Sequence, residues 1–118
     1  MATSVIRRDW QIVRSTYTEF TSSTSLAYTG ASITIPAYTI FGYWIFGGYQ
    51  NGKPMEILLS RSDTSMDSSN ILMHTTDGSG TSITGYTVDG SLTVYVWARY
   101  ANASTNRIYF RGWERTNH

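Results

Sequence analysis

The seven-residue run 40–46 (IFGYWIF) constrains this chain most, because it carries bulky apolar or aromatic side chains on both faces of a strand. Side chains of a β-strand alternate between its two faces. The two sets are Phe41, Tyr43 and Ile45 on one face and Ile40, Trp44 and Phe46 on the other. The core of one small domain buries only one such face, so the other is expected to meet a second subunit.

Composition predicts an all-β domain. The 118 residues include seventeen Thr, fifteen Ser, nine Tyr, four Trp and ten Gly, whereas only 14% are charged. A typical domain has about a quarter of its residues charged, and Thr, Tyr and Trp are enriched in strands. The length suits a single domain, 1–118, with one hydrophobic core.

Charge, cysteine content and hydropathy argue against several classes of function. The net charge is +1, with eight Arg and one Lys, so no basic surface for nucleic acid is predicted. The absence of Cys excludes a disulfide framework and thiol chemistry. Residues 1–10 lack the apolar segment of a signal peptide, and no run approaches the ~18 apolar residues that cross a bilayer. We therefore expect neither a nucleic-acid partner nor membrane insertion.

Turn dipeptides divide the chain into short alternating segments, as in a sandwich or barrel. Asn51-Gly52, Asp77-Gly78 and Asp89-Gly90 each favour a chain reversal, because Asn, Asp and Gly tolerate positive φ. The expected strands are 10–13, 16–20, 32–35, 38–46, 55–60, 71–75, 82–88, 92–100 and 107–113. No window shows the 3.6-residue repeat of an amphipathic helix.

Two later strands repeat the two-sided pattern of run 40–46. In 92–100 the aliphatic face comprises Leu92, Val94, Val96 and Ala98, and the opposite face comprises Thr93, Tyr95, Trp97 and Arg99. In 107–113 one face comprises Ile108 and Phe110, and the other comprises Arg107, Tyr109, Arg111 and Trp113. The aliphatic faces are assigned to the core. The opposite faces then carry several aromatic rings that need a partner.

No catalytic residue and no cofactor is predicted, and the chain is not expected to be an enzyme. A triad would rest on His74, which we interpret as a structural or surface histidine. The eight carboxylates form no paired-acid pattern and are interpreted mostly as solvated turn residues. Asp63, Asp67 and Asn70 offer oxygen ligands for calcium, but they lack the spaced pattern of a specific calcium loop. No metal site is predicted.

Three segments carry a resemblance to a known family. The segment PAYTIFGY at 36–43 resembles the entry to the central strand of the jelly rolls of tumour necrosis factor and of the complement globular heads. MEILLSR at 55–61 is similar to the next strand, and IYFRGW at 108–113 resembles the closing strand. The blocks span 32–113. Small Ser-, Thr- and Tyr-rich versions of this jelly roll form trimeric knobs on phage and bacterial fibre proteins, which this composition resembles.

The resemblance implies an antiparallel jelly-roll sandwich that forms a homotrimer. In the family, three copies pack around a threefold axis through the outer face of the sheet that holds the central and closing strands. The residues expected at that interface are Ile40, Trp44, Phe46, Tyr109, Arg111 and Trp113. Arg111 is expected to stack on a ring or to pair with a carboxylate, such as Glu114 or Glu56 of a neighbouring copy.

The expected function is that of a non-enzymatic binding knob on a virion or extracellular appendage, which attaches to a host-surface glycan or receptor. Aromatic rings with neutral hydrogen-bonding edges suit sugars. The residues expected to bind the ligand are Tyr95, Trp97, Arg99, Tyr49 and Asn51. Two alternatives remain open: a monomeric carbohydrate-binding module, or a purely structural trimerisation domain.

Overall fold

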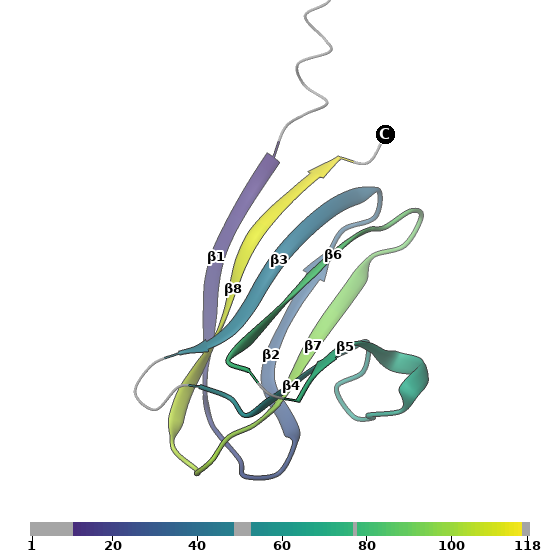
Figure 1. The fold of residues 1–118 in the computed structure, drawn as a ribbon. Coiled ribbons are helices and arrows are strands. Elements are labelled where there is room, and N and C mark those ends of the chain that lie inside the picture. Colours follow the sequence, from purple (N-terminus) through teal and green to yellow (C-terminus); the bar gives the residue numbers. More distant parts are fainter. Residues whose placement is uncertain (1–10, 49–52, 77, 117–118) are drawn as a thin grey trace, which may run out of the picture.

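Eight β-strands build the part of the chain that the computed structural model describes, residues 11–48, 53–76 and 78–116 (Figure 1). They are β1 (Gln11–Thr21), β2 (Ala27–Ile35), β3 (Thr39–Gly48), β4 (Glu56–Ser60), β5 (Ile71–Thr75), β6 (Gly80–Tyr86), β7 (Leu92–Arg99) and β8 (Thr105–Thr116). A short 3-10 turn, η2 (Ser68–Asn70), lies in the β4–β5 connection. No helix of the described residues is long and apolar enough to cross a membrane. The predicted all-β class is confirmed.

The strands form two four-stranded antiparallel sheets packed as a sandwich. Sheet I has the order β1-β8-β3-β6, and sheet II has the order β2-β7-β4-β5. The pairs β4–β5, β3–β6, β2–β7 and β1–β8 alternate between the two sheets, as in a two-stranded ribbon that is wound around itself. Such an order is compatible with a jelly roll. It also places the central and closing strands, β3 and β8, side by side.

The strand predictions differ from the structure at its N-terminal side. The segments 10–13 and 16–20 were expected as two strands, but residues 11–21 form one continuous strand that pairs with β8 from Gln11 to Thr21. Residue 10 lies outside the described residues. Strand β2 begins at Ala27 and not at 32, because a register shift lies between Tyr28 and Ala31. Gly30, with φ of 86°, occupies that bulge, so the alternation that identifies a strand is broken there.

The core lies between the sheets and is built from the faces that alternation assigned to it. Phe41, Tyr43 and Ile45 of β3 are buried, as predicted. Val94 and Val96 of β7 face them from sheet II within the same apolar cluster. The remaining buried members are Ala31, Ile33, Ile35, Ile57, Leu59, Ile108 and Phe110. Burying each large side chain stabilises the fold by about 1.5–3 kcal/mol.

Replacing Gly112 with Ala is expected to destabilise the sandwich strongly. An added Cβ would lie 2.1 Å from the Gly42 carbonyl oxygen and 2.7 Å from the Tyr43 ring. A backbone atom cannot move aside as a side chain does, so we expect a loss at or above the ~1–3 kcal/mol typical of overpacking. Chemical denaturation measures the loss. Gly90→Ala is the control, because no atom lies within 4 Å of its added Cβ, and equal effects of both variants would contradict this packing.

Candidate functional site

The outer face of sheet I gathers the aromatic residues that were predicted to line an interface. Cross-strand pairing aligns Tyr17, Tyr109 and Phe46 in one row across β1, β8 and β3. The same register pairs Trp44 with Arg111 and Gly42 with Trp113. We call the five rings the aromatic face: Tyr17, Trp44, Phe46, Tyr109 and Trp113. The expectation that run 40–46 and strand 107–113 present their rings on one face is therefore confirmed.

The rings of the aromatic face contact one another. Phe46 and Tyr109 stack with centroids 5.1 Å apart and an interplanar angle of 8°. Trp44 also stacks on Phe46, with centroids 5.9 Å apart, and the Tyr17 ring lies 5.6 Å from the Tyr109 ring. Offset or tilted ring pairs at such separations stabilise by about 0.5–1.5 kcal/mol beyond area burial. The four rings therefore form a preorganised row.

Glycines on the outer face allow two of the rings to lie against the backbone. A Cβ added at Gly42 would lie 2.9 Å from the Trp113 indole, and one at Gly80 would lie 2.8 Å from the Trp44 indole. The indoles thus occupy the volume that side chains at these positions would fill. Even so, Trp44 remains 44% exposed and Tyr17 remains 47% exposed. The face is an apolar surface with room for a partner.

Arginine side chains lie over these rings. The Arg107 guanidinium is 4.1 Å from the centroid of the Tyr17 ring, and its Nε donates to Glu19 at 3.3 Å. The Arg111 guanidinium lies 5.4 Å from the Phe46 centroid. Arg111 therefore stacks on a ring, which is one of its two expected roles.

Neither carboxylate that was expected to pair with Arg111 is free to do so. Glu114 is buried on the inner face of sheet I, so its proposed pairing across an interface is wrong. Glu56 lies on the other sheet and already accepts hydrogen bonds from His74 and Arg99. Of the described carboxylates, none lies within ion-pair distance of Arg111.

A shallow groove of about 270 Å³ runs across the aromatic face between Trp44 and Trp113. Ser82 and Thr84 of β6 line one side, and Arg111 of β8 lines the other. Two indoles, two hydroxyls and a guanidinium are a set of groups that suits a sugar ring or another polar ring.

The residues predicted to bind a ligand do not come together on β7. Trp97 was expected to be an exposed ring, and this is wrong: it is 8% exposed, and its Nε1 donates to the Ser62 carbonyl at 2.9 Å. Ser62 belongs to the β4–β5 connection, which lies beside β5 in Figure 1. The Tyr28 ring contacts Trp97 as well, with centroids 6.0 Å apart. Trp97 therefore offers no open face to a sugar.

Tyr95 and Arg99 lie on either side of the covered Trp97 and open into separate pockets. Tyr95 lines one pocket with Arg61, Ser91 and Thr93. Arg99 lines another with Lys53. The other two residues of the predicted site, Tyr49 and Asn51, lie outside the described residues. Tyr95 and Arg99, which were expected to belong to one ligand site, thus line two separate pockets, and the binding role of each remains a prediction.

A buried carboxylate that the sequence pattern did not predict lies at one end of the sandwich. Glu114 is 2% exposed, whereas it was expected to be available to Arg111 of a neighbouring copy. Its oxygens accept from Arg14 Nη2 at 3.1 and 3.3 Å and from the Tyr43 hydroxyl. The alternation of side chains along β8 could have predicted this burial. Glu114 lies on the same face of the strand as Ile108 and Phe110, which belong to the core.

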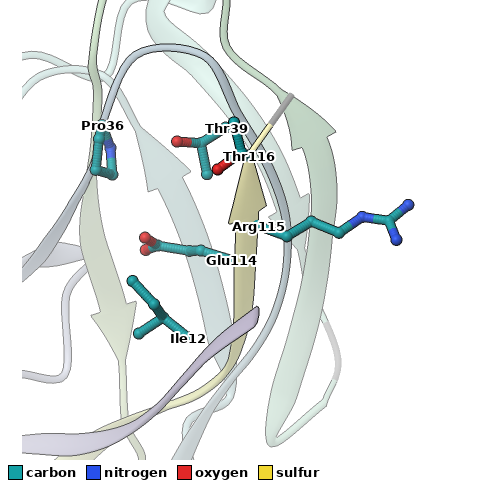
Figure 2. A pocket seen from close by; sticks show the side chains of 6 residues that line it. All are labelled: Ile12, Pro36, Thr39, Glu114, Arg115 and Thr116. Carbon is teal, nitrogen blue, oxygen red and sulfur yellow. The ribbon is translucent and has the colours of Figure 1, made fainter. Parts of the chain in front are cut away.

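Glu114 lines a pocket of about 160 Å³ at this end of the sandwich, formed by β1, β3, β8 and the β2–β3 connection. Figure 2 shows its carboxylate pointing toward the space beside Ile12, Pro36 and Thr39, whereas Arg115 points away. Burial, followed by the hydrogen bond to Glu114, raises the pKa of Tyr43 above its ordinary value. Arg14 and Tyr43 already bind this carboxylate, so we assign the cluster to stability.

His74 also belongs to a hydrogen-bonded cluster with Glu56 and Arg99. Its Nε2 lies 2.7 Å from Glu56 Oε2, and Arg99 Nε lies 3.2 Å from Glu56 Oε1. The hydrogen bond from His74, with that from Arg99, lowers the pKa of Glu56. In the described part of the chain, no hydroxyl is hydrogen-bonded to His74, and no three His, Asp or Glu side chains are grouped to hold a metal.

Comparison with protein-family models, curated proteins and solved structures finds no match to this chain.

Glu114→Gln is expected to lower the free energy of unfolding by about 2–3 kcal/mol. The change preserves shape but leaves the Arg14 charge without its counter-ion and turns an amide toward the Tyr43 hydroxyl or Arg14. Arg14 is partly exposed, which limits the loss. Urea denaturation measures it. Glu19→Gln, which breaks an exposed pair with Arg107, should cost under about 1 kcal/mol; a loss no larger at Glu114 would count against this assignment.

Stability is expected to fall as pH rises above about 10, the ordinary pKa of tyrosine. Burial raises the pKa of Tyr43, Tyr100 and Tyr28, so the folded chain keeps protons on these hydroxyls that the unfolded chain releases. Their contribution is complete below the unfolded pKa and is lost as pH rises toward the folded values, by about 1.4 kcal/mol per pH unit for each group. Denaturation at several alkaline pH values measures the slope.

Tyr43→Phe should reduce that slope by the share of one buried tyrosine, about 1.4 kcal/mol per pH unit, and Tyr86→Phe, at a 68% exposed position, is the surface control. A slope that is unaffected by Tyr43→Phe would show that this hydroxyl does not hold its proton in the folded chain.

Proposed function

We propose that this chain is a non-enzymatic trimeric binding knob with a jelly-roll fold, in which the aromatic face of sheet I joins three copies. The partner of the knob is a host-surface glycan or receptor, and its setting is a virion or extracellular appendage. The observation that carries the proposal is the row of mutually stacked rings on the outer face of β1, β8 and β3. The wound order of the strands and the resemblance of 32–113 to trimeric knobs support it.

The energetics of the aromatic face favour a protein partner. Trp44 and Tyr17 are nearly half exposed, so a packed neighbour removes further ring surface from water. Desolvation also strengthens the contacts of Arg107 and Arg111 with the rings, from about 0.5–1 kcal/mol at exposed sites to about 2 kcal/mol. Because the rings already stack on one another, little side-chain entropy is lost on association. A second and third copy of this chain supply matching rings.

Ligand binding is then left to sheet II. Two pockets remain there, one beside Tyr95 and one beside Arg99, at opposite ends of β7. Three copies of a weak pocket on one particle bind a multivalent surface more tightly than any single pocket does. This arrangement suits attachment to a cell surface.

A monomeric carbohydrate-binding module is the second candidate, and the groove between Trp44 and Trp113 favours it. In that case the aromatic face is an open platform on which sugars stack. The two candidates use the same rings differently. In the trimeric knob the rings are covered by other copies of the chain, whereas in the monomeric module they are exposed to solvent. A purely structural trimerisation domain shares the trimer with the first candidate but binds no saccharide.

The purified chain is expected to have the mass of a trimer at micromolar concentration, measured by light scattering coupled to gel filtration. Trp44→Asp should dissociate it, because a carboxylate replaces an indole in the centre of the aromatic face. The matched control is Met66→Asp, a residue of the β4–β5 connection with nearly the same exposure, 45% against 44%. It should keep the trimer mass.

A wild-type monomer would contradict the trimer. Should that monomer bind a neutral oligosaccharide, and lose it in Trp44→Ala, the carbohydrate-binding module would replace the knob as the proposed function.

A further inference from the structure

The pocket beside Arg99 at the start of β4 differs from the other surfaces in its charge. Its volume is about 410 Å³, and it is lined by Lys53, Pro54, Met55, Thr76, Gly78, Ser79 and Arg99. Lys53 is the single lysine of the chain. The described lining thus combines two cations with two hydroxyl side chains and contains no carboxylate.

The walls of this pocket are held by backbone hydrogen bonds between segments far apart in sequence. Met55 N donates to the Arg99 carbonyl at 2.7 Å, which fixes the entry to β4 against the end of β7. Gly47 N donates to the Ser79 carbonyl at 2.9 Å, which fixes the β5–β6 connection against β3. The pocket is therefore formed before any ligand arrives, which reduces the entropy lost on binding.

Glu56 orients the Arg99 side chain through its Nε and leaves the rest of the guanidinium available to a ligand. The carboxylate accepts from Arg99 Nε at 3.2 Å and from His74 at 2.7 Å. Within the described residues, the two terminal nitrogens of Arg99 have no such partner. A guanidinium held through its Nε presents these nitrogens as a fork, the geometry that binds a carboxylate or sulfate through two hydrogen bonds. Lys53 adds a second positive charge at the same pocket.

We propose that this pocket binds an acidic saccharide, with the anionic group of the sugar between Lys53 and Arg99. Its hydroxyls then meet Thr76 and Ser79, and its apolar ring face meets Met55. A pocket of this volume is in the range of small organic ligands. The described lining contains no aromatic ring of the kind on which nucleobases stack. The inference rests on the proposed function only in taking the ligand to be a saccharide.

The test is a titration of the isotope-labelled chain by NMR with three ligands that share one neutral core: lactose, sialyllactose and lactose carrying a sulfate ester. Binding of at least one acidic form, with lactose much weaker, is expected, and the peaks that shift should include Thr76, Gly78 and Ser79. The two acidic arms distinguish a carboxylate from a sulfate as the recognised group. Sodium sulfate alone is the fourth arm and should bind more weakly than the acidic sugars.

Lys53→Gln should weaken binding of the acidic saccharide by about fivefold. Lys53 is exposed, so the variant is expected to fold. Arg61→Gln removes an exposed arginine at the other end of sheet II and should change nothing. The proposal is overturned if no arm binds, if lactose or inorganic sulfate binds as well as the acidic sugars, or if Lys53→Gln keeps full affinity. Because the pocket lies apart from the aromatic face, these outcomes are separate from the mass measurement that tests the trimer.

Discussion

The alternation of side chains along β3 is the constraint on which the rest of this structure depends. Tyr43 fills the core and reaches Glu114, whereas its neighbour Trp44 lies on the outer face. A shift of one residue in register would exchange these two rings and leave the core with the wrong shapes. The same register pairs Gly42 with Trp113, which lets that indole lie against the strand. Core and surface are thus determined together by one strand.

The parts of the fold that follow a simple period of two could be predicted. Alternation assigned the buried faces of β3, β7 and β8 correctly, since each has bulky apolar residues at every second position. It failed in the first half of β2, because the bulge at Gly30 breaks the period while the strand continues. Alternation also divided β1 into two predicted strands, because the polar centre of β1 gives no strand signal of its own. The structure shows one strand that pairs with β8 throughout. In both places the length of the strand is determined by its pairing with the neighbouring strand, which the local sequence pattern does not reveal.

The candidate surfaces were predictable only where a strand face alone determines exposure. The aromatic face met this condition, since its rings belong to neighbouring strands of one sheet. Trp97 did not, because a Ser- and Asp-rich connection with no apolar period covers it through Ser62. Glu114 is the opposite case, because it is a charged side chain that is buried. A carboxylate is usually exposed to solvent, but Arg14, a hundred positions away in sequence, neutralises this one inside the sandwich.

The pairing of β1 with β8 has a consequence for how the chain folds. These strands come from opposite ends of the described sequence, so sheet I is completed only when its most distant segments meet. Pairing over such separations is slow, because the entropy of closing a long loop is lost before the contacts form. During synthesis β1 cannot pair with β8 until β8 has left the ribosome. Tyr17 likewise cannot contact Tyr109 before Tyr109 has been added to the chain. Completion of sheet I is thus a late step in the folding of this sandwich.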